Sequence, residues 1–194
     1  MTSWHPTAIV ATDALVGEST QIGPYCVIGV DGDDVPVSIG ESAVTRSHSV
    51  VYRGVRAGNR LALGHGALVR EGTVLGDDVS IGSHSVVEHH VTIGNGVRLH
   101  SHCFVPEYTV LGDGAWLGPG VRITNARYPN RADTKDKLEP VVIADGAVIG
   151  AAAVILPGVR IGEGALVGAG AVVVHDVREG ATVVGNPATE VGAL

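Results

Sequence analysis

Aromatic residues, cysteine and long apolar runs are all scarce in this chain. Aromatics make up 4% of the 194 residues while hydrophobic residues make up 45%, so a core has to be built from aliphatic side chains. No apolar run is long enough to span a bilayer, and the N-terminus lacks the basic and apolar regions of a signal peptide. A net charge of −7 argues against a nucleic-acid-binding surface. These absences predict a cytoplasmic protein without nucleic-acid or membrane partners.

A branched aliphatic residue recurs with a period of six, and a small residue follows it four places later. The two cysteines, Cys26 and Cys103, occupy the small position, which predicts buried thiols and no disulfide. A period of six fits neither a helix nor a simple half-buried strand, but it fits three short strands per turn of a parallel β-helix. The aliphatic positions are Ile39, Val51, Leu63, Val69, Leu75, Ile81, Val87, Ile93, Leu99, Val105, Leu111, Leu117, Ile123, Ile143, Ile149, Ile155, Ile161, Val167 and Val173.

The repeat predicts one all-β solenoid of roughly nine coils over residues 1–179, followed by a cap or tail over 180–194. Two breaks interrupt it. The first is a short bulge at Asp34–Ser38, and the second is a polar excursion at residues 129–142 without the repeat. A polar loop on a rigid scaffold favours a binding role, although a tolerated surface insertion explains it too. Flat apolar faces also predict symmetric self-association.

Residues eighteen apart should stack if three hexads make one coil. One such column holds His48, Gly66, His84, His102 and Gly120, and its neighbour holds Arg53, Glu71, His89, Glu107 and Asn125. By the same arithmetic Arg160 lies below Arg178. The histidines fit a solvated polar ladder, a general base, or a metal site between subunits, for which a third ligand is missing.

The C-terminal third carries a family resemblance. Residues 149–159 (IGAAAVILPGV), 167–173 (VGAGAVV) and 184–188 (VGNPA) resemble the acyl-CoA-binding end of the hexapeptide-repeat acyltransferases. That family has a left-handed β-helix and acts as trimers, so the resemblance implies a left-handed parallel β-helix, a homotrimer and acetyl-CoA as co-substrate, with no metal. It also implies a set of donor-binding residues: Gly118, Gly120, Ala151, Ala152, Gly168, Ala169, Arg160, Arg178, Asn186 and Pro187. For the two arginines, plain surface charges are an equal alternative.

A narrower resemblance lies at residues 117–129 (LGPGVRITNARYP). This segment is similar to the branch that N-acetylates amino sugars carried on UDP or dTDP, in which the polar excursion follows at the same place. O-acetylating relatives carry a catalytic histidine in this loop, where the present chain has Arg127 and Tyr128. The sugar-nucleotide branch commonly has an asparagine where this chain has His102. His102 is therefore either a true base or a residue that positions substrate.

Acetyl transfer to an amine needs proximity, an oxyanion donor and a proton acceptor. We expect His102 and Asn125 to be catalytic, with the departing CoA thiolate as an alternative acceptor of the proton. The N–H groups of Gly118 or Gly120 are the expected oxyanion donors. For the nucleotide-linked sugar the expected binding residues are His65, Arg70, Glu71, His84, Arg127, Tyr128 and Arg131, with Arg53 as a further phosphate candidate. For the segment from His65 to Glu71, an ion pair on a structural face is an equal alternative.

Three other functions remain open at this point. One is O-acetylation of a sugar or an antibiotic, against which the missing loop histidine counts. The second is a metal lyase like the β-helical carbonic anhydrases, which the histidine-rich middle suggests. The third is a β-helical scaffold without catalytic activity.

Overall fold

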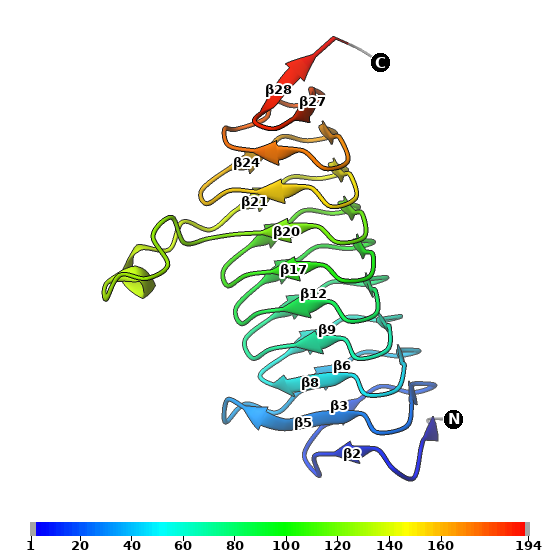
Figure 1. Cartoon of the computed structure of the whole chain (residues 1–194). Coiled ribbons are helices and arrows are strands. Elements are labelled where there is room, and N and C mark those ends of the chain that lie inside the picture. The colour runs from blue at the N-terminus through cyan, green and yellow to red at the C-terminus, as the bar shows by residue number, and fades with distance from the viewer. Residues whose placement is uncertain (1–2, 193–194) are drawn as a thin grey trace.

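The chain winds into a parallel β-helix of about ten turns, close to the predicted nine. The computed structural model describes residues 3–192, so the first and last two residues of the ranges predicted above lie outside the described part. The prism rises from the N-terminus at one end to the C-terminus at the other, with one loop projecting from its side (Figure 1). The all-β class and the solenoid architecture predicted from the six-residue repeat are confirmed.

Three sheets of 11, 9 and 8 strands form the faces of the prism. Sheet A contains β1 (Ser3–Trp4), β4 (Gln21–Ile22), β7 (Val44–Thr45), β10 (Ala62–Leu63), β13 (Ser80–Ile81), β16 (Arg98–Leu99), β19 (Trp116–Leu117), β22 (Val148–Ile149), β25 (Leu166–Val167), β27 (Thr182–Gly185) and β28 (Ala188–Val191). Sheet B contains β2 (Ile9–Val10), β5 (Val27–Gly32), β8 (Val50–Arg53), β11 (Leu68–Val69), β14 (Val86–Val87), β17 (Phe104–Val105), β20 (Arg122–Ile123), β23 (Val154–Ile155) and β26 (Val172–Val173). Sheet C contains β3 (Leu15–Val16), β6 (Ser38–Ile39), β9 (Arg56–Ala57), β12 (Val74–Leu75), β15 (Thr92–Ile93), β18 (Val110–Leu111), β21 (Val142–Ile143) and β24 (Arg160–Ile161).

The core is the column of aliphatic side chains that the repeat predicts. The second residue of most two-residue strands points inward; Ile81, Leu99 and Leu117, for example, are at most 1% exposed. The small residues four places later are buried beside them, and Cys26 and Cys103 are both buried free thiols. Burial raises the pKa of the Cys103 thiol. Each coil therefore buries its aliphatic residues against the coils above and below, and no separate domain is needed for a core.

Turns between consecutive sheets form three edges, which we call the A/B, B/C and C/A corners after the sheets they join. At the C/A corner, Asp and Asn side chains link neighbouring coils, because they accept hydrogen bonds from the backbone of the coil below. Asp77 Oδ1 accepts from the Asn59 N–H at 2.7 Å, and Asp113 Oδ1 accepts from the Asn95 N–H at 2.7 Å. This ladder of side-chain acceptors runs along one edge of the prism.

Two breaks occur close to where the sequence predicts them. The first lies between β5 and β6, so that Ser38, expected in the bulge, already belongs to a strand. The second leaves the prism after Asn125 and contains the 3-10 helix η1 (Thr134–Lys137). The Glu139 N–H donates to the Asn125 carbonyl at 2.7 Å, which closes the excursion at its base. Val142, predicted as part of the excursion, is in β21.

The C-terminal stretch expected as a cap begins with a further strand of the solenoid. β27 pairs in parallel with β25, and β28 then folds back antiparallel onto β27. Among residues 3–192, no helix is long and apolar enough to cross a lipid bilayer.

Candidate functional site

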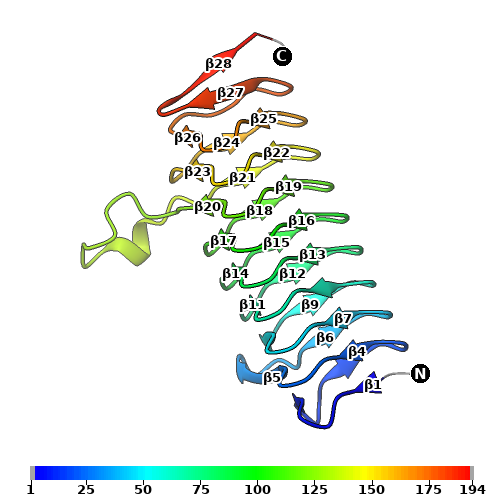
Figure 2. The ribbon, with the colours of Figure 1, turned by 45° about the vertical axis from the view of Figure 1, so that its right-hand side comes forward.

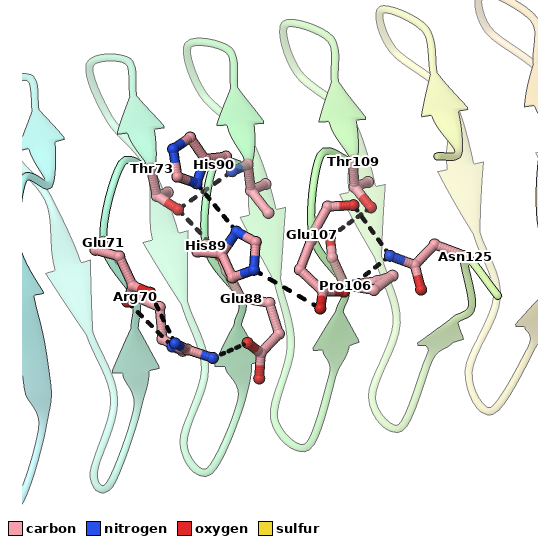
Figure 3. Close-up of polar contacts among 11 residues, drawn as sticks. Arg70, Glu71, Thr73, Glu88, His89, His90, Pro106, Glu107, Thr109 and Asn125 are labelled. Atoms are coloured by element: carbon pink, nitrogen blue, oxygen red, sulfur yellow. Dashed lines mark hydrogen bonds and ion pairs between the residues drawn. The ribbon is translucent and has the colours of Figure 1, made fainter. Parts of the chain in front are cut away.

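A dense polar cluster occupies the B/C corner beside the start of the loop excursion (Figure 3). Arg70 follows β11 and forms ion pairs with both Glu71 and Glu88, each with a shortest N–O distance of 2.7 Å. The Arg70 guanidinium donates hydrogen bonds to both of these carboxylates. Arg70 and Glu71 were expected to bind a nucleotide-linked sugar, but in the structure they form an ion pair with each other.

His89 lies in the next turn of the same corner and contacts a carboxylate. Its Nε2 is 3.8 Å from Glu107 Oε1, and its Nδ1 is 3.0 Å from His90 Nδ1. The Asn125 amide donates to Glu107 Oε2 at 2.8 Å. The three side chains form a row in which Asn125 holds Glu107 and Glu107 faces the imidazole (Figure 3).

The surroundings of Glu107 and Glu71 favour the ionised form of both carboxylates. Burial by itself raises the pKa of Glu107, but the Asn125 amide, the residue's own backbone N–H and the charges of His89 and Arg70 outweigh burial and lower the pKa below its usual range. The pKa of Glu71 is lowered in the same way, since its backbone N–H, Arg70 and His89 overcome the effect of burial. A negative charge therefore stands behind His89 at neutral pH. With Glu107 at Nε2, the ring nitrogen of His89 left to accept a proton is Nδ1, which in this structure contacts His90 Nδ1.

Asn125, predicted to be catalytic, is buried with 7% of its surface exposed. Its amide N–H₂ donates to the Glu107 carboxylate, and its backbone carbonyl accepts from the Glu139 N–H. The side chain is therefore committed to orienting Glu107 at the base of the loop.

Within the loop only one of the expected phosphate-binding arginines lacks a carboxylate partner. Arg127 binds Glu139 through two hydrogen bonds of 3.0 and 2.9 Å. Arg131 instead stacks on the exposed Tyr128 ring, with its guanidinium carbon 4.1 Å from the ring centroid. Arg53 is also occupied, because Asp13 binds it through both carboxylate oxygens. Of these three candidates, Arg131 alone offers a guanidinium without a carboxylate in the described part of the chain.

The other predicted catalytic residue, His102, lies on the A/B corner. It stacks on His84 with ring centroids 5.4 Å apart, as the eighteen-residue column predicts. His65 lies on the same corner and shares a hydrogen bond of 2.8 Å with the Ser47 hydroxyl. His102 and Asn125 therefore lie at opposite edges of sheet B. Five residues of extended chain separate these edges, on the order of 15 Å, so one protomer does not bring the two side chains together.

The small residues expected to bind the donor form one continuous column along the A/B corner. Its members are Gly118, Gly120, Ala151, Ala152, Gly168 and Ala169. The Gly118 and Gly120 N–H groups, expected as oxyanion donors, are already used, because they donate to the carbonyls of Ile149 and Ser101. The peptide N–H groups of Ala151 and Ala169 donate to no acceptor among the described residues. The column thus presents free donors in a strip without bulky side chains.

The predicted stacking of Arg160 and Arg178 is wrong. β24 bridges to Val177 opposite Ile161, which is sixteen residues later, so Arg178 lies above Gly162. Arg178 is also paired with Glu190 of β28 at 2.6 Å. Arg160 projects from the outer face of sheet C, while Asn186 and Pro187 form the tip of the β27–β28 hairpin. These four donor-binding candidates therefore do not form one group.

Sequence reasoning missed Glu107 and His89 as a functional unit, and it missed Glu88 and His90 beside them. The signal was present, because the column arithmetic places His89 between Glu71 and Glu107. Within residues 3–192, no three His, Cys, Asp or Glu side chains converge in a way that could hold a metal ion. The described part of one protomer therefore offers no complete ligand set for the metal-lyase alternative.

Comparison with known proteins gives a family match over part of the chain. The model of the bacterial transferase hexapeptide family (six repeats) matches residues 72–107 and 140–175. A curated relative, the acyl-[acyl-carrier-protein]–UDP-N-acetylglucosamine O-acyltransferase of a Psychrobacter species, is 43% identical over 58 residues. That match covers 30% of this chain and 20% of the relative, so the chain spans about a fifth of the length of the protein it matches.

Solved structures share the architecture over nearly the whole chain. The UDP-N-acetylglucosamine acyltransferase of Campylobacter jejuni aligns with a TM-score of 0.64 and 18% identity, covering 96% of this chain and 73% of that one. The polySia-specific acetyltransferase NeuO aligns with a TM-score of 0.58 and 16% identity, covering 98% of this chain and 83% of that one. At these identities the likeness is one of fold.

Proposed function

Because this chain is a hexapeptide-repeat protein, we propose that it is an acyltransferase that takes an acetyl group from acetyl-CoA. The observation that carries this proposal is the small-residue column of the A/B corner with the free N–H groups of Ala151 and Ala169. Pantetheine is an extended chain with two amides, and its carbonyls need donors spaced along a smooth surface. The matched family, whose members are transferases, supports the same assignment.

The acceptor we propose is the amino group of a sugar linked to UDP or dTDP. The Gly-Pro, Thr-Asn and Tyr-Pro pairs of residues 117–129 support it, together with the polar excursion that follows them. Tyr128 and Arg131 lie on that excursion, where an aromatic ring and a guanidinium suit a base and a phosphate. The chemistry joins the amine nitrogen to the thioester carbonyl, expels the CoA thiolate and releases one proton from nitrogen.

Two imidazoles compete to accept that proton. His102 was expected from the sequence, but its nearest ring partner is His84, another imidazole. His89 has the ionised Glu107 behind it, which stabilises the imidazolium that proton transfer creates. We therefore propose His89 as the general base and keep His102 as a residue that contacts substrate.

The proposed assembly is a homotrimer with its active site between protomers. The donor column and the His89–Glu107 unit lie on different edges of one prism, so a neighbouring protomer has to supply one of them. The outer face of sheet B carries Leu68, Val86 and Phe104, all only partly buried in the single chain. These side chains provide apolar surface for such a contact.

Calorimetric titration with acetyl-CoA is the first test, and we expect saturable binding near one site per chain. A screen of UDP- and dTDP-amino sugars then identifies the acceptor. With that acceptor, His89→Asn should lower kcat by about 10²-fold or more while KM for acetyl-CoA stays unchanged. The same loss in His102→Asn alone would move the base to the A/B corner. Normal kcat in both variants would leave the CoA thiolate as the proton acceptor.

A second function, O-acylation of a sugar hydroxyl, is favoured by one observation. The curated relative that is 43% identical over 58 residues is an O-acyltransferase of UDP-N-acetylglucosamine. An imidazole with a carboxylate behind it suits a hydroxyl, because a hydroxyl has to lose its proton as it attacks, whereas a neutral amine can attack first. Parallel assays with UDP-N-acetylglucosamine and with amino-sugar acceptors distinguish the two reactions.

A further inference from the structure

The outer face of sheet A and the A/B corner contain no acidic residue over seven successive coils. Residues 44–48, 62–66, 80–84, 98–102, 116–120, 148–152 and 166–170 hold neither aspartate nor glutamate. The same segments hold two arginines and five histidines, in a chain whose net charge is −7. The strands concerned, among them β7, β13 and β16, follow one another along one side of the prism (Figure 2). This face therefore favours anions, although the protein as a whole repels them.

Both arginines of this face, Arg46 and Arg98, are exposed and unpaired. Neither guanidinium contacts a carboxylate anywhere in the described part of the chain. Five other arginines do have carboxylate partners: Arg53, Arg60, Arg70, Arg127 and Arg178. The contrast leaves Arg46 and Arg98 with their donors free to bind a ligand.

A shallow trough connects these two arginines. It encloses about 430 Å³, with both arginines among its lining residues. Its floor is low because Ala62 and Ser80 occupy the outward strand positions. At its far end His100 packs edge-on against Trp116, with ring centroids 4.6 Å apart. The donor column begins at Gly118, one coil beyond His100.

Hydroxyl groups lie along the side of the trough that borders the A/B corner. Ser83 and Ser101 both line it. Ser83 Oγ already accepts a hydrogen bond from the His65 N–H, so its own O–H remains available to donate. The trough therefore combines two free guanidiniums with hydroxyl donors, and its lining residues include no acceptor with a negative charge.

The two arginines stand at opposite ends of the trough. Three strand spacings separate the coils of Arg46 and Arg98, on the order of 14 Å. An anion that carries two linked phosphate groups can meet one guanidinium with each phosphate, and both side chains are free to lean toward it. We propose that this trough binds a diphosphate group, whether as part of a nucleoside diphosphate or as a free polyphosphate. The inference depends on charge and shape alone and holds whether or not the proposed acyl transfer is correct.

Direct binding without turnover tests the proposal. Titrations at low salt would use inorganic pyrophosphate, UDP and CoA with the wild-type protein, the double variant Arg46→Gln/Arg98→Gln and the control Arg56→Gln. Arg56 is a matched control, because it is also exposed and unpaired but projects from sheet C. None of the three replaced guanidiniums has a partner among the described residues, so thermal unfolding of the variants should match that of the wild type.

We expect pyrophosphate and UDP to bind the wild type and Arg56→Gln equally, and to bind the double variant at least about tenfold more weakly. Added salt should weaken binding to the wild type. If the double variant loses affinity for pyrophosphate and for UDP by the same factor, the trough recognises the diphosphate itself. If it loses more affinity for UDP than for pyrophosphate, the nucleoside contributes to binding. If CoA binding weakens as well, the donor's diphosphate is a further source of the ligand. The proposal is overturned if neither pyrophosphate nor UDP binds the wild type, or if both bind the double variant as tightly as Arg56→Gln.

Discussion

Replacing Glu107 by glutamine removes the negative charge behind His89 but keeps the size of the side chain and an oxygen that can accept from Asn125. His89 Nε2 and Glu107 Oε1 are 3.8 Å apart, with 24% and 29% of the two side chains exposed. Two opposite charges at this distance attract by about 4 kcal/mol at an effective dielectric constant of about 20. Partial exposure and salt reduce this, since fully exposed pairs contribute about 1 kcal/mol or less.

We therefore expect Glu107→Gln to cost the imidazolium-like transition state roughly 1–2 kcal/mol, which lowers kcat by roughly 5- to 30-fold. KM for acetyl-CoA should not change, because the free N–H groups of Ala151 and Ala169 lie on another corner. Steady-state kinetics with the identified acceptor measures both parameters. The split between kcat and KM separates loss of the charge from a general loss of structure, which would affect both.

Glu88→Gln is the matched control for this prediction. Glu88 belongs to the same cluster and binds Arg70 at 2.7 Å, but no contact joins it to His89. We expect its kcat to stay within about twofold of the wild type, as for a partly exposed ion pair remote from the reacting atoms. The reasoning is refuted if Glu107→Gln folds normally and keeps full kcat, or if Glu88→Gln loses as much activity as Glu107→Gln.

Three further predictions concern the core, the loop and one partly buried histidine. Ala153 is fully buried, so Ala153→Leu should overpack a coil and lower the free energy of unfolding by roughly 1–3 kcal/mol in chemical denaturation; a neutral result would contradict the inward register. Arg131→Ala should raise KM for the sugar nucleotide and leave acetyl-CoA binding unchanged, and the reverse pattern in kinetics would mean that the loop binds the donor. Burial and then the charge of Arg98 lower the pKa of His100 below 6.5, so the unfolded chain binds this proton more readily than the folded one. The free energy of unfolding should therefore fall as the pH drops below about 6.5, and His100→Phe should flatten that fall in denaturation curves at several pH values.

The fold could be predicted from the sequence because one physical requirement repeats. Every coil has to bury an aliphatic residue such as Ile81 and a small residue such as Ala115, and only a three-sided solenoid does this with a period of six. The eighteen-residue arithmetic that follows correctly stacks His84 under His102. It fails at Arg160 and Arg178, because the last coil is shortened where β24 meets Val177.

Side-chain partners could not be predicted in the same way. The column places His89 between Glu71 and Glu107 as equal neighbours, but Arg70 takes Glu71 and leaves Glu107 for the imidazole. Each of these charged side chains has several possible partners within reach. Which pairs form depends on side-chain rotamers and on competition between partners, neither of which can be deduced from the repeat. Arg127 is likewise occupied, because it forms an ion pair with Glu139. Glu139 lies beside Arg127 because the loop closes through the hydrogen bond from the Glu139 N–H to the Asn125 carbonyl, a contact between distant residues that the sequence does not indicate.

The rigidity of the solenoid has a consequence for the proposed reaction. Proton transfer requires the base within about 3 Å of the attacking atom, and the thioester carbonyl has to be about 3–3.5 Å from that atom. His89 lies on the B/C corner beside β14, whereas the free N–H groups of Ala151 and Ala169 lie on the A/B corner, on the order of 15 Å away across sheet B and three and four coils further along the prism. Each strand of sheet B between β2 and β26 is hydrogen-bonded to neighbours on both sides, so the sheet cannot fold to bring its own edges together. If both corners take part, the donor column of one protomer has to face the His89–Glu107 unit of another, and a monomer that keeps its fold and binds acetyl-CoA should be unable to transfer the acetyl group.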